Sequence, residues 1–320
     1  IHSWRIDTSP NICFPLILFD FYQHPHILTL AKMKQKLNCF NNFWMQLEQF
    51  NKARSTSFSF VHHFKQSTYL VQDSSCFYVA KTDVNPQRAS DIESCLKFIG
   101  EDSTLSQLAP RLIDKFDLYT SGFLLLFSFL PGTPLLRNQT RDVLDHLFSL
   151  SLNIENIVLN CVPDISNMVS CFLSTILSMT TSDPLLNLFS NRLSNGPPDQ
   201  TVCCVHGDFT WQNFILCPDT CLPTLKIIDW EQSGLGFKGF DFGWLLSSGH
   251  HTGLLKFSDF PSLNENLEFF IIFGYLRMIY RLRKVRHKTE LHMMHEVKCL
   301  SDLRDFINFF ELPESRLHFF

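Results

Sequence analysis

Several polar side chains between positions 206 and 229 follow two short apolar runs. Asp208 follows the apolar run 202–205, Asn213 comes five residues later, and Asp229 ends a second apolar run at 225–228. If two short strands deliver these residues to neighbouring loops, one carboxylate can face an acceptor hydroxyl. The Asn amide and the other carboxylate then offer oxygen ligands to a hard cation such as Mg²⁺. Positioning and charge neutralisation are what phosphoryl transfer requires of a protein.

The stretch 201–246 resembles the catalytic core of the aminoglycoside phosphotransferase and choline kinase superfamily, the small-molecule branch of the protein-kinase-like fold. His206, Asp208 and Asn213 match the H-x-D-x-x-x-x-N loop of that superfamily. Asp229, in the sequence Ile-Asp-Trp-Glu, matches its metal-binding aspartate. The resemblance implies an α+β, two-lobed protein-kinase-like fold with a small β-rich N-lobe and a mainly helical C-lobe.

The same resemblance implies an ATP-dependent phosphotransferase that moves the γ-phosphoryl group to a hydroxyl of a small molecule. Asp208 would orient the acceptor and take up its proton, or hold it in line, and His206 would brace the loop. Asn213 and Asp229 would bind Mg²⁺ at the nucleotide phosphates. Asp241, in the sequence Phe-Asp-Phe-Gly, is expected to brace the catalytic loop.

The elements that would position the nucleotide are predicted upstream. The segments 58–64, 68–72 and 76–81 have the pattern of strands, and Lys81 ends the third of them in Tyr-Val-Ala-Lys. The resemblance assigns Lys81 to the α- and β-phosphates, and it pairs Lys81 with Glu93 on a helix predicted over 91–99. An ordinary strand-end lysine and a solvated helix glutamate are the alternatives.

The turn between the first two of these strands, within residues 62–67, contains no glycine. Side chains make a close approach of the backbone to phosphate harder, although Lys65 or Ser67 could contact a phosphate. This departure leaves open a rival function, a catalytically inactive kinase-like protein that binds a nucleotide or another ligand. A protein kinase is a third alternative, disfavoured by His-Gly-Asp in place of His-Arg-Asp and by the lack of an A-P-E segment.

An apolar run at 123–130, followed by the turn 131–135, resembles the hinge whose backbone binds adenine. The expected division is therefore 1–54, an N-terminal extension of uncertain role; 55–130, the N-lobe; and 131–320, the C-lobe. The extension either packs on the core or is the tail of an upstream domain. Helical patterns are predicted around 144–151 and at 168–179, 269–279 and 300–310.

Composition argues against several other classes of function. The 320 residues are 45% hydrophobic, which suffices for a two-lobed core, and a net charge of −4 gives no general attraction to nucleic acid. No apolar run is long enough to span a membrane. The 11 cysteines are odd in number and irregularly spaced, which favours reduced thiols and a cytoplasmic location. The pairs His250-His251 and His292/His295 lack the further ligands of a zinc site.

A basic cluster lies at and beyond the end of the predicted helix 269–279, formed by Arg277, Arg281, Arg283, Lys284, Arg286 and Lys288. A solvated helix face is the ordinary explanation, and a site for an anionic substrate or partner is the alternative. The acceptor is expected to be a sugar, an amino-alcohol or an aminoglycoside. Similarity to phosphotransferase-like proteins of sugar and surface-glycan metabolism favours sugars among these. The oligomeric state is left open.

Overall fold

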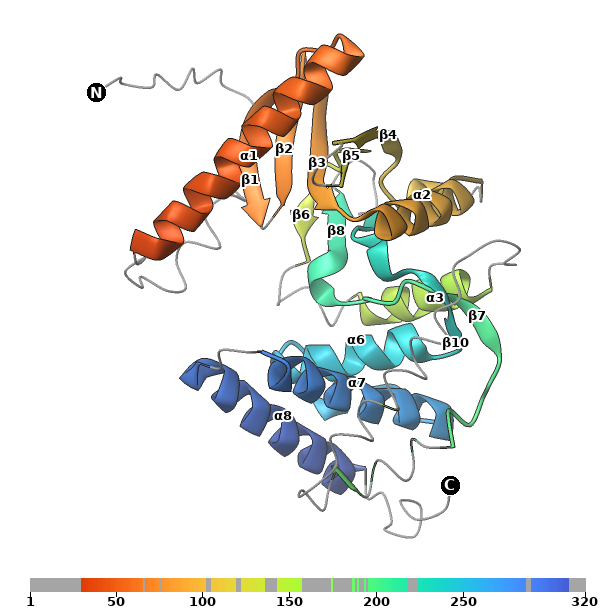
Figure 1. The fold of residues 1–320 in the computed structure, drawn as a ribbon. Helices are drawn as coiled ribbons and strands as arrows, with labels where there is room; N and C mark the ends of the chain where they lie inside the picture. The colour runs from red at the N-terminus through yellow and green to blue at the C-terminus, as the bar shows by residue number, and fades with distance from the viewer. Residues whose placement is uncertain are drawn as a thin grey trace.

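The computed structural model describes residues 30–65, 67–74, 76–101, 105–118, 122–135, 143–156, 195–217, 224–285 and 289–310, together with residues 174, 186, 187, 189 and 193. Within these residues a sheet with two flanking helices occupies one end of the molecule, and packed helices occupy the other (Figure 1). The predicted order of a β-rich part followed by a mainly helical part is therefore observed.

The N-terminal part is a five-stranded antiparallel sheet with the order β1-β2-β3-β5-β4. The three strands predicted upstream are found within three residues of their expected bounds, as β1 (Ser59–Lys65), β2 (Thr68–Asp73) and β3 (Cys76–Val84). The predicted hinge strand is β5 (Phe123–Ser128), and β4 (Leu112–Asp117) lies at the edge beyond it. Lys65 pairs with Thr68, so the glycine-free connection between β1 and β2 is a tight hairpin.

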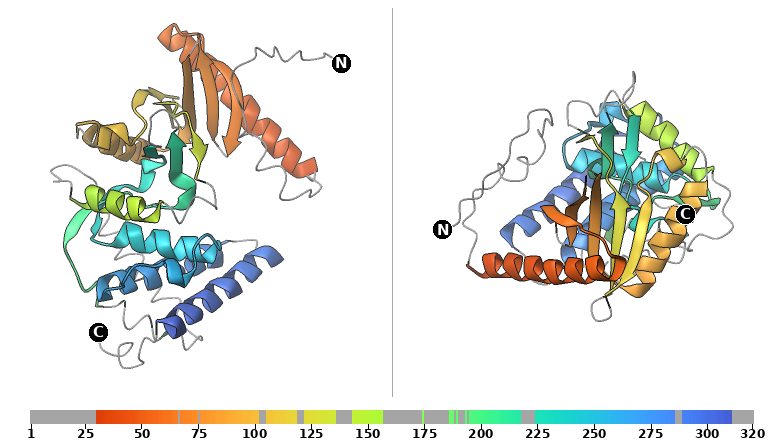
Figure 2. Two further views of the ribbon diagram at one scale, coloured as in Figure 1. Left: turned by 180° about the vertical axis from the view of Figure 1, so that it is seen from behind. Right: turned by 90° about the horizontal axis from the view of Figure 1, so that it is seen from above.

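The two faces of this sheet are covered by different helices (Figures 1 and 2). α1 (Leu30–Arg54) packs Phe43, Leu47 and Phe50 onto one face. There the ring of Phe43 stacks on that of Tyr69, with centroids 3.7 Å apart. The predicted division at residue 54 stays a prediction, but the described part of the segment before it packs on the core.

Strand alternation separates two hydrophobic cores. Side chains along a strand point to opposite faces in turn, and in β5 Leu124 and Leu126 join the core under α1. Leu125 between them joins the main core, together with α2 (Pro86–Glu101) and the C-terminal part. η1 (Leu105–Gln107) connects α2 to β4.

Two short ladders connect the sheet to the helical part. β6 (Thr133–Pro134) pairs with β8 (Phe214–Cys217), which pairs with β9 (Thr224–Ile227). β7 (Val202–Val205) pairs with β10 (Gly234–Phe237). The 3₁₀ turns η3 (Trp211–Asn213) and η4 (Trp230–Gln232) lie at the ends of these strands. The predicted catalytic motifs thus fall on the loops that join the two ladders.

The helical part contains α3 (Leu144–Glu155), α6 (Phe240–His251), η5 (Phe257–Asp259), α7 (Glu265–Arg283) and α8 (Glu290–Phe309). α6 and α7 pack closely, because a Cβ on Gly243 would lie 2.8 Å from a backbone carbon of Phe270. This contact fixes α7 against the catalytic elements. The helix predicted at 168–179 lies outside the described residues. Among the described helices, none has the length and apolar character to cross a bilayer.

Candidate active site

The loop that leaves β7 is held by a buried aspartate from α6. Asp241 accepts hydrogen bonds from the backbone N–H groups of His206 at 2.5 Å and Gly207 at 2.9 Å. Burial raises the pKa of Asp241 to about 7, and the two N–H donors and nearby Arg277 act in the opposite direction. Asp241 therefore braces the catalytic loop (residues 206–213), as the sequence predicts.

His206 joins the catalytic loop to the loop that carries Asp229. Its side chain is fully buried, its Nδ1 accepts the N–H of Asp208 at 3.3 Å, and its Nε2 lies 3.0 Å from the carbonyl of Ile228. These contacts fit a neutral ring with its hydrogen on Nε2. Burial lowers the pKa of His206, which favours that neutral form. The geometry supports the predicted bracing role.

Asp208, Asn213 and Asp229 are brought to the same place. The amide nitrogen of Asn213 donates to the carbonyl of Asp208 at 2.8 Å and lies 3.4 Å from its Oδ2. Pairing of β8 with β9 continues in a bond from the Ile228 N–H to the Asn213 carbonyl at 2.9 Å. Asp229 follows in the left-handed conformation, with φ 66° and ψ 48°, which short polar residues tolerate better than most.

Lys81 reaches this cluster from the sheet. Its ammonium group lies 3.0 Å from Oδ1 of Asp229, and the two side chains are 24% and 27% exposed. β3 and the loop after β9 are therefore joined across the boundary between the two parts of the molecule.

The predicted partnership between Lys81 and Glu93 needs correction. Glu93 lies on the solvent side of α2 and pairs with Lys115 of β4 at 2.6 Å. The inward positions of α2 are taken by Ile92, Cys95 and further apolar residues. The phase of α2 thus points Glu93 toward the edge strand and away from Lys81.

Arg277 of α7 lies at the site, although the sequence favoured a solvated helix face over an anion site for the basic cluster that contains it. Its side chain is 4% exposed, and its guanidinium donates to the Gly207 carbonyl at 3.0 Å and to Oε1 of Gln232 at 2.8 Å. It stacks over the ring of Trp244 at 4.4 Å. Burial lowers the pKa of Arg277 to about 9, which leaves the group charged at neutral pH.

Both Arg277 and Arg281 face the carboxylate of Asp208. The guanidinium nitrogens lie 3.9 and 3.7 Å from its Oδ1, and the indole nitrogen of Trp244 lies 3.3 Å from the same atom. The i,i+4 spacing of the two arginines, which puts them on one helix face, was the available sequence signal. Arg283, by contrast, pairs with Glu296 of α8 at 2.6 Å.

Comparison with known proteins supports the sequence resemblance. A family model described as the phosphotransferase enzyme family matches residues 180–296, the segment that holds Asp208, Asn213, Asp229 and both arginines. No curated protein sequence matches the chain significantly.

Solved structures of small-molecule kinases share the fold of this chain. Choline kinase LicA from Streptococcus pneumoniae has a TM-score of 0.56 at 13% identity, covering 82% of this chain and 99% of that chain. The GDP complex of wild-type aminoglycoside 2'-phosphotransferase-IIIa has a TM-score of 0.56 at 14% identity, covering 84% and 98%. A microcompartment-associated aminopropanol kinase has a TM-score of 0.51 at 14% identity, covering 81% and 94%.

The resemblance to the phosphotransferase superfamily is confirmed. The α+β, protein-kinase-like fold is confirmed with it, so the sheet with α1 and α2 is the N-lobe and the helical part is the C-lobe. The site built around Asp208 lies between these lobes, where Lys81 meets Asp229.

The oxygen donors of this site fit a hard cation such as Mg²⁺. Among the described residues no group of three His, Cys, Asp or Glu side chains is placed to hold a metal. Asp229 and Asn213 instead offer oxygen atoms, and Asp229 already bonds to the cationic ammonium of Lys81. Mg²⁺ is commonly held by one or two such ligands together with substrate phosphates.

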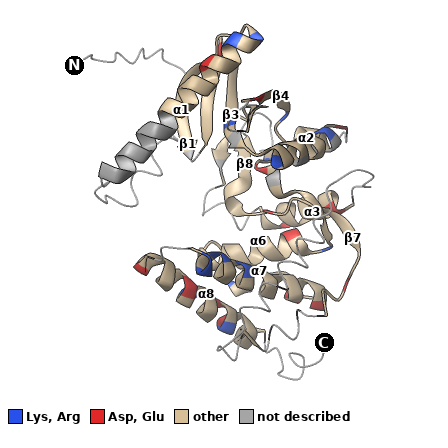
Figure 3. Ribbon diagram, in the orientation of Figure 1, with Lys and Arg blue, Asp and Glu red and all other residues tan. Residues whose placement is uncertain are grey.

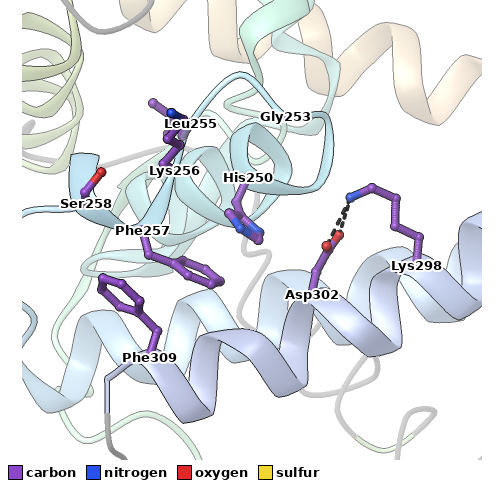
Figure 4. A pocket seen from close by; sticks show the side chains of 9 residues that line it. All are labelled: His250, Gly253, Leu255, Lys256, Phe257, Ser258, Lys298, Asp302 and Phe309. Atoms are coloured by element: carbon purple, nitrogen blue, oxygen red, sulfur yellow. Dashed lines mark hydrogen bonds and ion pairs between the residues drawn. The ribbon is translucent and has the colours of Figure 1, made fainter.

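A hollow of about 500 Å³ lies in the C-lobe between α8 and the segment after α6 (Figure 4). Its lining includes His250 and Asp302 but none of the predicted site residues. His250 contacts the Tyr275 hydroxyl at 2.9 Å, and His251 contacts Asp302 at 2.7 Å. Both histidines of this pair have structural partners, and His292 caps α8 with Thr289.

Proposed function

We propose that this chain is an ATP-dependent phosphotransferase that moves the γ-phosphoryl group to a hydroxyl of a small molecule. The observation that carries the proposal is the convergence of Asp208, Asn213 and Asp229 on adjacent loops, with Lys81 arriving from the N-lobe. Similar structures include choline, aminopropanol and aminoglycoside kinases, and nucleotide complexes with GDP and with AMP.

Asp208 is the proposed base. Its carboxylate is 19% exposed and is oriented by the amide of Asn213 and the indole of Trp244. The acceptor oxygen bonds to the γ-phosphorus, the bond from that phosphorus to the bridging oxygen of ADP breaks, and the hydroxyl proton passes to Asp208. Asn213 and Asp229 would hold Mg²⁺, which when bound neutralises charge on the nucleotide phosphates.

His206, Asp241 and Arg277 hold the base in position. Each of them bonds to the backbone of the catalytic loop, from a different element. Lys81 is proposed to contact the α- and β-phosphates. Glu93 is left outside this set because its partner is Lys115.

The test is ADP release from the purified chain with ATP, Mg²⁺ and a panel of sugars, amino-alcohols and aminoglycosides. Asp208→Asn should lower kcat by about 100-fold or more, since a positioned base contributes on that order. Nucleotide-induced thermal stabilisation should persist in that variant and weaken in Asp229→Ala. Undiminished turnover in Asp208→Asn would sink the mechanism.

The rival proposal, a binding protein without turnover, is favoured by one observation. The connection between β1 and β2 is a tight hairpin closed by the Lys65–Thr68 pair, in a stretch without glycine. Nucleotide-induced stabilisation with no ADP release from any acceptor would support this rival. Cys76, Cys95, Cys203, Cys204 and Cys299, which are free thiols in the described residues, support a cytoplasmic setting for either function.

A further inference from the structure

The two oxygens of the Asp208 carboxylate face different surroundings. Oδ2 lies toward Asn213, which with Asp229 forms the proposed metal and nucleotide side. Oδ1 lies toward Trp244, Arg277 and Arg281. Because the γ-phosphate must arrive from the metal side, the side of the two arginines is left for the acceptor.

The two arginines differ in how many of their hydrogen-bond donors are available to a ligand. Arg277 is buried and donates to Gly207 and Gln232, so its hydrogen-bonding capacity is largely used within the protein. Arg281 is 45% exposed, and its 3.7 Å approach to Asp208 is longer than a hydrogen bond. Its other described contact is with the Trp244 ring, at 5.4 Å. Arg281 can therefore direct donors toward a bound molecule.

The charges around Asp208 are unsuited to a cationic acceptor. Figure 3 shows Lys and Arg gathered in the C-terminal half of α7. At the same end of α7, Arg283 pairs with Glu296 of α8, and Lys284 lies over the ring of Tyr280 at 4.5 Å. The aromatic ring that could bind an ammonium group, that of Trp244, already has both guanidinium groups over it, at 4.4 and 5.4 Å.

We propose that the acceptor is an alcohol that carries an anionic group, a carboxylate or a phosphate, and that Arg281 is the residue that selects it. The proposal rests on the phosphotransferase function above. A guanidinium can bind either anion through two parallel hydrogen bonds, and it would do so beside the base that receives the hydroxyl proton. The products are the phosphorylated anionic alcohol, ADP and a proton, which leaves Asp208 for water.

The test uses a matched set of three-carbon acceptors: glycerol, glycerate, glycerol phosphate and aminopropanediol. A five-carbon set of ribose, ribonate and ribose phosphate is run beside it. With the wild-type chain, ATP and Mg²⁺, we expect kcat/KM for the better anionic member of a set to exceed that of its neutral member by about tenfold or more. Comparing kcat/KM for glycerate with that for glycerol phosphate, and for ribonate with that for ribose phosphate, shows whether the preferred anionic group is a carboxylate or a phosphate.

Arg281→Gln is the decisive variant, and Lys284→Gln is its matched control, because Lys284 is an exposed cation three residues further along the chain, at the C-cap of α7. Arg281→Gln should remove the anionic preference, with about a tenfold loss for the anionic acceptor and less than about threefold for the neutral one. Lys284→Gln should preserve the preference. An equal loss for every acceptor in Arg281→Gln would overturn the proposal, since it would place Arg281 on the transferring phosphoryl group.

Failure of this proposal and failure of the phosphotransferase function give different results. Turnover that favours aminopropanediol leaves the enzyme standing and overturns the anionic acceptor. Thermal stabilisation by glycerate or ribose phosphate that depends on Arg281, without ADP release from any compound, upholds the anionic ligand and overturns phosphoryl transfer. Neither stabilisation nor release would overturn both.

Discussion

The C-lobe side and the N-lobe side of the candidate site are built in different ways. On the C-lobe side, the backbone groups of His206 and Gly207 are bonded to buried side chains, those of Asp241 and Arg277. On the N-lobe side, Lys81 meets Asp229 in an ion pair whose two side chains are both about one-quarter exposed.

This difference has a physical meaning. Buried hydrogen bonds to charged groups are strong, and leaving one partner unsatisfied is costly, so the catalytic loop is fixed before any ligand binds. A partly exposed ion pair contributes little to stability and exchanges partners easily. The proposed base, Asp208, is therefore preorganised, whereas Lys81, which is proposed to contact the nucleotide, can move between Asp229 and the phosphates.

Gly207→Ala is expected to give the largest effect, because it changes the backbone of the rigid catalytic loop on the C-lobe side. Gly207 has φ +78°, and a Cβ there would lie 2.0 Å from the backbone oxygen of Gln232. The variant should lose about 2 kcal/mol or more of unfolding free energy, measured by denaturant titration, and most of its turnover. Gly100→Ala in α2 is the control, since nothing lies within 4 Å of its added Cβ. An unchanged midpoint in Gly207→Ala would show that the catalytic loop is not rigid.

Lys81→Met probes the exchangeable side. It should weaken ATP binding by about tenfold while changing the unfolding free energy by less than about 1 kcal/mol, because the ion pair is partly exposed. Lys115→Met is the matched control: Lys115 is also 24% exposed and pairs with one carboxylate, Glu93, in the same sheet. Isothermal titration with a non-hydrolysable nucleotide measures the nucleotide affinity of both variants. Equal weakening in the two variants would remove the special role of Lys81.

His206→Gln should show a pH dependence. Burial holds the pKa of His206 below its usual 6.5. As the pH falls below 6.5, His206 therefore becomes protonated in the unfolded chain before it does in the folded chain. The stability advantage of the wild type over His206→Gln should be complete above about pH 6.5. It should shrink below that pH by up to about 1.4 kcal/mol per unit.

Asp241 acts in the opposite direction over the same range. Its pKa is raised to about 7 from 3.8, so the folded chain binds its proton first and its contribution favours folding as the pH falls from about 7 toward 4. Subtracting variant from wild type at each pH cancels this contribution. A difference that stays constant from pH 7.5 to 5 would mean that His206 titrates normally in the fold.

Glu93→Gln should have the smallest effect. Its carboxylate is 49% exposed and pairs with Lys115, so the change should alter ATP affinity and kcat by less than about twofold. A loss as large as that of Lys81→Met would restore the pairing that the sequence suggested. A steady-state titration of ATP at saturating acceptor measures both quantities.

Local patterns carried most of what the sequence revealed. The strands around 58–84, the hinge strand and the order Asp208, Asn213, Asp229 depend on residues close in the chain, where periodicity and motif spacing are informative. Asp241 was also predictable, because its motif lies in the same stretch. Its two bonds to the loop confirm the expected bracing role.

What the sequence did not reveal depends on how distant elements are rotated against one another. Arg277 lies 70 residues along the chain from Gly207, whose carbonyl it binds. The sequence pattern of a basic helix end is the same whether that end faces solvent or a carboxylate. The predicted pair of Lys81 and Glu93 was wrong for the same reason. The rotation of α2 against the sheet decides whether Glu93 meets Lys81 or Lys115. Such phases are set by packing, through close approaches such as that of Gly243 to Phe270.

The separate core beneath α1 has a practical consequence for dissecting the protein. A fragment that starts at β1 would keep the motifs but uncover the sheet face formed by Tyr69, Val71, Phe116, Leu124 and Leu126. A contiguous aromatic and aliphatic surface of that kind promotes self-association. Domain truncations and proteolytic trimming should therefore retain residues from Leu30 onward, and aggregation of a shorter fragment would report the loss of this helix rather than a defect in the catalytic site.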